Sequence, residues 1–239
     1  MLQTKYFCSF LNVFKGLIVK RDMGKEIRSV SFDPSGDILA VGYKDGQISL
    51  VNFSIDKKEL IEARKTRERN AAILCVRFSP DGKSLVASSE NCCIDFFDVQ
   101  QDKLTRLGYV TRIAEAVSQI DWSTNSLYIR TTTVGYHALT FHAPIGEEVK
   151  NPKEIEAIVW NTWTSPSGDD IIGIWPNEVK KGHINCAHVT SSTIATGDDL
   201  GAVKLFKFPC SEPGAEFKIF YGHSDNVTNV RFLAHEKYL

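Results

Sequence analysis

Three kinds of sequence feature in this 239-residue chain could do chemistry, and the first resembles a metal site. The segment "HINCAH" places His183, Cys186 and His188 within six residues. Zinc takes four such ligands, and a fourth is missing here. If residues 184–189 form a strand, Cys186 and His188 share a face and His183 lies in the preceding loop. We therefore interpret the cluster as structural and expect no metal.

Two pairs of acids, Asp169–Asp170 and Asp198–Asp199, could suggest general acid–base catalysis. Each pair consists of sequence neighbours, and neither has an identifiable nucleophile or base as a partner. Acids in such glycine-rich surroundings commonly form turns. A phosphate-binding glycine loop, an HExxH zinc helix and a GxSxG nucleophile elbow are also missing from the sequence. We expect no catalytic residues and no cofactor, so the chain is predicted not to be an enzyme.

The third stretch, "RKTRER", is the densest positive run in the chain. It offers Arg64, Lys65, Arg67 and Arg69 as candidates for protein interaction, and we expect it to be a surface loop. Such a run is most often a solvated face. If it binds a partner, its charge would steer an acidic surface toward it, with a strong dependence on salt.

The composition excludes several classes of partner. The 28 basic and 29 acidic residues nearly cancel, which argues against nucleic acid and anionic membranes as partners. There is no run of 18 apolar residues that would predict a membrane span, and the N-terminus lacks the pattern of a secretory signal. The six cysteines show no paired framework, which suits a reducing compartment. We therefore expect a cytoplasmic location.

The elements that would position these residues come from an internal repeat. "IRSVSFDPSGDILAVGYKDGQISLVNF" begins at Ile27, and "ILCVRFSPDGKSLVASSENCCIDFFDV" begins 46 residues later at Ile73. A third copy places Trp122 at the position of Phe78, 44 residues on. A fourth copy begins at Ile184, and a shorter fifth begins at Val227.

Each copy combines alternating apolar strands with proline–glycine and acid–glycine turns. Four short strands in roughly 40 to 45 residues are typical of a WD-repeat β-propeller blade. A β-sandwich would not repeat its turns at a fixed period. We predict an all-β chain that forms an incomplete WD-repeat β-propeller, with about four blades and part of a fifth. Asp45, Asp199 and His223 are predicted to be structural residues of the blade turns.

The repeat divides the chain into regions. Residues 1–24 are expected to lead into the propeller without forming a clear blade, and residues 25–239 to form the partial propeller. The repeat is interrupted by an irregular, aromatic-rich segment at about 143–183, which holds Trp160, Trp163 and Trp175. Tryptophans in such a segment either fill a core or form an interface. We favour core packing for Trp160 and Trp175, and Trp163 is the candidate interaction residue.

The motifs "WNTWTS", "IIGIWP", "ATGDDLGAVKLFKFPCS" and "YGHSDNVTNVRF" occur in this order and spacing. With the upstream "LAVGYKDGQISLVN", they resemble the echinoderm microtubule-associated protein-like family, from about Glu26 to Leu239. The resemblance implies two fused atypical propellers, of which this chain would supply part of the second. It also implies tubulin or microtubules as partners and a cytoskeletal location.

Two further expectations follow from the resemblance and the repeat. Four blades and part of a fifth would need neighbouring blades of a parent chain, so we expect the isolated chain to be unstable or prone to aggregation. The function is predicted to be that of a non-catalytic scaffold that binds tubulin. The alternatives are a general WD-repeat scaffold for a complex without tubulin and, less favoured, a propeller enzyme.

Overall fold

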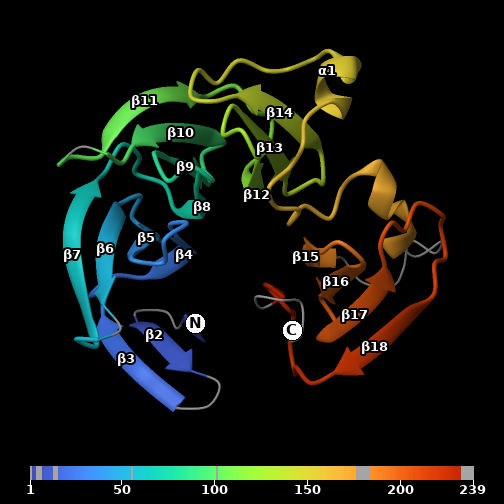
Figure 1. Ribbon diagram of the computed structural model, residues 1–239, viewed down its shortest axis with the longest axis horizontal. Coiled ribbons are helices and arrows are strands. Elements are labelled where there is room, and N and C mark those ends of the chain that lie inside the picture. The colour runs from blue at the N-terminus through green and yellow to red at the C-terminus, as the bar shows by residue number, and fades with distance from the viewer. Residues whose placement is uncertain are drawn as a thin grey trace. The chain divides into compact units, whose positions relative to one another are not determined.

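A computed structural model describes residues 2–3, 7–12, 16–54, 56–100, 102–175 and 184–232. The described chain is built from antiparallel sheets with very little helix, which confirms the all-β class and the incomplete propeller (Figure 1). It divides into two compact units. The first comprises residues 1–134 and 139–159, and the second comprises residues 135–138 and 160–239.

The described residues of the first unit form four antiparallel sheets, each made of strands that are consecutive in the chain. Its first sheet contains β1 (Leu2–Gln3), β2 (Phe7–Asn12) and β3 (Gly16–Asp22). The second contains β4 (Ile27–Phe32), β5 (Ile38–Tyr43), β6 (Ile48–Ser54) and β7 (Glu59–Thr66). The third contains β8 (Ile73–Phe78), β9 (Ser84–Ser89), β10 (Cys93–Asp98) and β11 (Thr105–Val110). The fourth contains β12 (Val117–Trp122), β13 (Tyr128–Thr133) and β14 (Ala138–His142).

Among its described residues, the second unit contains one four-stranded sheet and a short helix. Its elements are the 3-10 helix η1 (Asp169–Ile174) and the strands β15 (Ile184–Val189), β16 (Thr193–Asp198), β17 (Ala202–Lys207) and β18 (Phe217–Tyr221). The interrupted part of the repeat thus contains η1 and, in the first unit, the short helix α1 (Pro152–Glu156). Residues 176–183 lie outside the described part of the chain.

The repeat is visible in the backbone of the turns. The turn between the second and third strands of each repeat contains a residue with positive φ at the same position: 86° at Gly46, 60° at Cys92, 66° at Tyr136 and 77° at Gly201. Positive φ is strained for residues other than glycine, so its retention at Cys92 and Tyr136 shows that the surrounding strands determine this turn.

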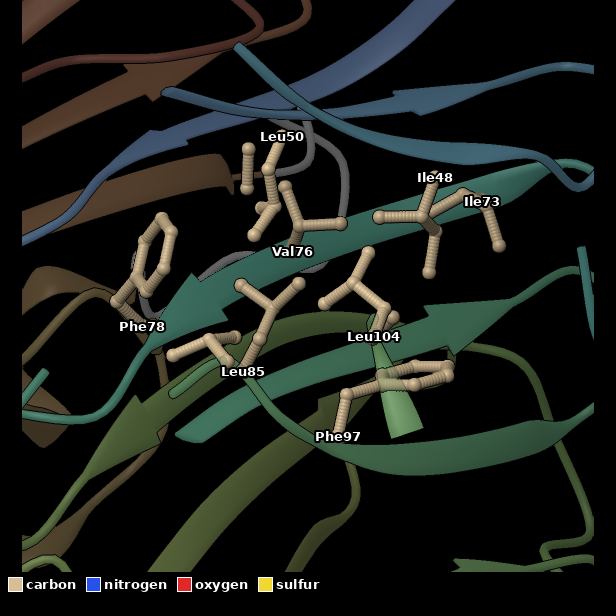
Figure 2. Close-up of a cluster of buried hydrophobic side chains, with 11 residues drawn as sticks. Ile48, Leu50, Ile73, Val76, Phe78, Leu85, Phe97 and Leu104 are labelled. Atoms are coloured by element: carbon tan, nitrogen blue, oxygen red, sulfur yellow. The ribbon is translucent and has the colours of Figure 1, made fainter. Parts of the chain in front are cut away.

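The sheets of the first unit pack face to face through apolar side chains. Figure 2 shows one of these interfaces, between the β4–β7 and β8–β11 sheets, where eight labelled side chains converge: Ile48, Leu50, Ile73, Val76, Phe78, Leu85, Phe97 and Leu104. Leu50, Val76, Leu85 and Phe97 have no exposed surface. Each such side chain contributes about 1.5–3 kcal/mol by leaving water, so these interfaces supply much of the stability of the unit.

Residues 1–24 differ from the expectation of a lead without clear blade structure. They hold β1, β2 and β3, an antiparallel sheet with one strand fewer than the sheet that follows. Cys8 of β2 is fully buried in a cluster with Leu39, Val41 and Leu60. The strands were not predicted because polar residues interrupt the apolar pattern of this segment. Strands as short as two to seven residues need only a few apolar positions.

Candidate interaction surface

The positive run Arg64–Arg69 is not the surface loop that we predicted, because β7 extends through Thr66. Arg64 is half-buried in this strand, and its Nη1 donates a hydrogen bond to the carbonyl oxygen of Val99 at 2.5 Å. Lys65 is exposed and forms an ion pair with Glu62, with 3.2 Å between Nζ and Oε1. Arg64 therefore helps to hold the β4–β7 sheet to the next sheet.

Arg69 is also committed to the fold. Its Nε and Nη2 each donate a hydrogen bond of 2.8 Å to the two carboxylate oxygens of Asp95, whose side chain is only 4 % exposed. Arg106 approaches the same carboxylate at 3.4 Å and stacks over the ring of Tyr109. The hydrogen bonds to Asp95 raise the pKa of Arg69. Of the four predicted cations, Lys65 and Arg67 remain as exposed candidates.

Arg69 occupies the position in its repeat that His223 occupies in the fifth repeat, and its sequence context as part of a positive run concealed this. It precedes Ile73, the first residue of β8, by four residues, just as His223 precedes Val227. The backbone at both positions packs against the turn glycine of the preceding sheet. A Cβ added to Gly46 would lie 2.0 Å from the carbonyl oxygen of Arg69, and a Cβ added to Gly201 would lie 2.4 Å from the carbonyl oxygen of His223. Spacing from the next repeat was the signal that would have assigned Arg69 to the scaffold.

The acids of the blade turns accept hydrogen bonds from the backbone, and in the fourth repeat the acid that does so lies one residue before the predicted Asp199. Asp45 accepts hydrogen bonds from the backbone N–H of Gln47 and from Lys25. Partial burial raises the pKa of Asp45, but these bonds outweigh it and the net pKa lies below its usual value. In the fourth repeat it is Asp198, and not the predicted Asp199, whose Oδ1 accepts the N–H groups of the turn.

The register of β16 explains this correction. Asp198 is the last residue of the strand and is almost fully buried, whereas Asp199 is exposed. Oδ1 of Asp198 accepts hydrogen bonds from the backbone N–H of Leu200 at 3.0 Å and of Ala202 at 2.9 Å. Oδ2 of Asp198 pairs with Nζ of Lys204 at 3.1 Å. Asp198 therefore lies on the inside of the turn, whereas Asp199 follows the strand and is exposed.

The tryptophans of the interrupted segment pack in different ways. Trp175 is half-buried in the core of the second unit, where its indole N–H donates to the carbonyl oxygen of Pro166 at 3.1 Å. Trp163 is half-buried in the same cluster, with its ring 5.9 Å from that of Phe208. Trp160 is also half-buried, in an isolated β-bridge. Trp163 therefore combines packing with partial exposure and remains a candidate for protein interaction.

The residues first considered for metal chemistry have structural environments where they are described. Cys186 is fully buried, and burial raises the pKa of its thiol to about 11. His188 Nδ1 accepts the backbone N–H of Phe232 at 3.0 Å. His183 lies outside the described residues. The described residues contain no group of three or more histidine, cysteine or acidic side chains arranged to hold a metal ion.

The acids Asp169 and Asp170 begin η1, where both are exposed. The carbonyl oxygen of Asp170 accepts the N–H of Cys210 and so connects η1 to the segment after β17. No helix in the described part of the chain is long and apolar enough to cross a membrane. The candidate surface therefore consists of sheets whose turns are held by hydrogen bonds to acidic side chains, with Lys65 and Arg67 as exposed cations.

A family model and the curated relatives of this chain point to the same protein family. The family model for the echinoderm microtubule-associated protein second beta-propeller matches residues 10–239. Echinoderm microtubule-associated protein-like 1 of Rattus norvegicus is 32 % identical over 216 residues, which are 89 % of this chain and 26 % of that protein.

Two further relatives agree with this match. The 77 kDa echinoderm microtubule-associated protein of Strongylocentrotus purpuratus is 29 % identical over 209 residues, covering 86 % of this chain and 30 % of that protein. Echinoderm microtubule-associated protein-like 4 of Xenopus laevis is 29 % identical over 243 residues, covering 99 % of this chain and 26 % of that protein. The chain thus spans about a quarter to a third of the length of these relatives. The resemblance seen in the sequence motifs is confirmed: the chain belongs to the echinoderm microtubule-associated protein family, and the part of the family that it matches is the second β-propeller.

Proposed function

We propose that this chain is a non-catalytic interaction scaffold that binds tubulin or microtubules in the cytoplasmic cytoskeleton. The observation that carries the proposal is the match of residues 10–239 to the family's second propeller. The relatives are named as microtubule-associated proteins, and this association is transferred here as a proposal. A rigid stack of sheets can present loops to a partner without any reacting group.

The distribution of charge supports a binding role over a catalytic one. Of the acids that could suggest catalysis, Asp198 accepts hydrogen bonds from its own turn, and Asp169 and Asp170 are exposed at the start of η1. Lys65 and Arg67 are exposed at the end of β7, where they can meet an acidic surface such as that of tubulin. Attraction between exposed charges falls as salt rises, so this contact should weaken at high ionic strength.

Co-sedimentation of the full chain with microtubules at a series of salt concentrations tests the proposal, together with pull-down of soluble tubulin. Charge reversal of Lys65 and Arg67 to glutamate should weaken binding roughly twofold to thirtyfold, from about 0.2–1 kcal/mol for each exposed charge pair. The matched control reverses Lys57 and Lys58, which are exposed in the turn after β6.

Each outcome has a clear meaning. Equal loss of binding in both charge-reversed variants would refute the assigned surface but keep tubulin as the partner. If the chain binds neither microtubules nor tubulin at low salt, the tubulin proposal is wrong. A scaffold for a different protein complex would then be the better description.

A further inference from the structure

Thr66, the last residue of β7, carries a hydroxyl group in the middle of the positive run. Arg64 and Lys65 precede it, and Arg67 and Arg69 follow it. β7 is the last strand in the order of its sheet and lies at the outer edge of that sheet (Figure 1). The chain beyond Thr66 has no regular secondary structure before β8. The hydroxyl is thus half-buried at the point where an edge strand ends.

The Thr66 hydroxyl is connected through an anion to a cation of the neighbouring sheet. Its Oγ1 donates a hydrogen bond to Oε1 of Glu68 at 3.1 Å. Oε2 of Glu68 lies 3.5 Å from Nη1 of Arg106 on β11. The same Nη1 lies 3.4 Å from Oδ1 of Asp95, and the guanidinium stacks over the ring of Tyr109. The Glu68 carboxylate therefore occupies a place for negative charge between the hydroxyl and a guanidinium that has other contacts to hold it.

The charge around Thr66 favours one class of enzyme. Residues 64–69 hold four cations and one acid, which gives them a formal charge of +3. Protein kinases select their substrates partly by charge pattern. A basophilic kinase, whose substrate groove is acidic, is attracted to a hydroxyl with basic residues on both sides. The flanks of Thr66 meet this requirement.

Ser35 shows that a hydroxyl bonded to a nearby acid is not sufficient. Its Oγ donates to Oδ2 of Asp33 at 2.5 Å, so it is also bonded to an acid two residues away. Ser35 is exposed in the turn between β4 and β5, but its acidic neighbours are Asp33 and Asp37. Thr66 differs from it by combining basic flanks with the guanidinium of Arg106.

We propose that Thr66 is the acceptor site of a basophilic protein kinase and that its phosphate takes the place of the Glu68 carboxylate opposite Arg106. The kinase transfers the γ-phosphoryl group of ATP. The bond between the γ-phosphorus and the bridging oxygen breaks and releases ADP, and a bond from phosphorus to Oγ1 forms. The hydroxyl proton passes to the catalytic carboxylate of the kinase.

The phosphate changes the contacts of its neighbours. It replaces a hydrogen-bond donor by about −1.5 to −2 charges and three acceptor oxygens, which repel Glu68. A guanidinium pairs strongly with phosphate, so Arg106 exchanges one anion for the other. The formal charge of residues 64–69 falls from +3 to about +1, which weakens attraction to an acidic surface. This last consequence depends on the proposed function, whereas the acceptor site and its arginine do not.

Phosphorylation of the full chain with ATP and the catalytic domain of protein kinase C tests the acceptor site. A protease that cleaves after glutamate releases residues 63–68, in which Thr66 is the only hydroxyl residue. We expect mass spectrometry to find the phosphate on this peptide. Thr66→Ser should keep the modification, and Thr66→Ala should lose it. Ser35 should stay unmodified.

Neutral variants of the flanks test whether charge selects the site. Lys65→Gln with Arg67→Gln should slow phosphorylation of Thr66 by roughly tenfold, because the attraction to the acidic groove is reduced. The matched control, Lys57→Gln with Lys58→Gln, removes two exposed cations from the turn after β6 and should leave the rate unchanged.

Phosphorus NMR of the phosphorylated chain tests the contact with Arg106. The second pKa of a phosphothreonine in a free peptide is about 6. In the folded chain we expect this pKa to be lower by roughly 0.5, because a nearby guanidinium favours the dianion. Arg106→Gln should restore most of the difference while it leaves the positive run intact. Unfolding the phosphorylated chain in urea gives the same comparison if that variant does not fold.

Three results would overturn the proposal. The first is no phosphate on residues 63–68 under conditions in which the kinase modifies a basic control peptide. The second is an unchanged rate after Lys65 and Arg67 are made neutral. The third is the same phosphate pKa in the folded chain, in Arg106→Gln and in urea. None of these measurements contains tubulin, so they can fail while the proposed function stands, and the reverse also holds.

Discussion

The pairing of Arg69 with Asp95 leads to a quantitative prediction about stability. Arg69→Ala removes two hydrogen bonds of 2.8 Å from a carboxylate that is 4 % exposed. Breaking a buried pair by removing one partner costs about 3–5 kcal/mol, because a buried charge is left without its counter-ion. Arg106 remains at 3.4 Å and compensates in part. We therefore expect the free energy of unfolding to fall by about 2–3 kcal/mol.

Urea denaturation followed by circular dichroism measures this change. The matched control is Arg67→Ala, which removes an exposed cation two residues away and should change the free energy of unfolding by less than about 0.5 kcal/mol. Arg69→Lys should fall between the two, since lysine keeps the charge but cannot form both bonds of the guanidinium.

A loss of stability in Arg69→Ala no larger than that in Arg67→Ala would refute the reasoning. It would mean that Arg106 alone satisfies Asp95, or that the pair contributes nothing beyond its desolvation cost. The tubulin assay adds a second distinction. If Arg69 belonged to the binding surface instead of the scaffold, Arg69→Ala would weaken binding at unchanged stability.

Three further predictions concern turns, thiols and pH. Gly46→Ala should lower the melting temperature by more than Gly36→Ala. Both glycines have positive φ, which costs alanine about 1–2 kcal/mol. Only at Gly46 would the new Cβ also collide with a backbone oxygen, that of Arg69. With a thiol reagent at pH 8, half-buried Cys92 should react before buried Cys186, whose pKa is raised by burial to about 11; similar rates in the folded chain would contradict this order. Partial burial raises the pKa of Asp33, but hydrogen bonds from its own turn outweigh it, so the folded pKa lies below the unfolded one. Its stabilisation is present above the unfolded pKa and is lost as pH falls through the folded pKa, and Asp33→Asn should flatten the acid side of the stability curve.

The strands and their repetition were predictable because each produces a periodic pattern of residue types in the sequence. Alternation of apolar residues predicts each strand, and the turn glycines Gly36, Gly46 and Gly82 all have the positive φ that this residue type favours. The fold could be read even where the turn residue is replaced, since Cys92 stands at the position of Gly46 and takes the same backbone conformation. The period of the repeat therefore carried more information than the identity of any one residue.

The interaction surface was less predictable because it depends on distant partners. A run of cations in the sequence shows charge but not what neutralises it. Asp95 lies 26 residues from Arg69, and Val99 lies 35 residues from Arg64. Only the folded chain brings these groups together, so a run that suggested one patch divides into half-buried and exposed members.

The same reasoning separates scaffold from surface throughout the chain. At the end of β16, Asp198 is buried in its turn, and Asp199, the first residue after the strand, is exposed. Along β7, the alternation of the strand half-buries Arg64 and exposes Lys65. Because buried charges must be paired, the inward members are held by the fold and cannot serve a partner as well. A charged binding surface on this chain must therefore be sought among outward positions such as Lys65, and charge density along the sequence overestimates it.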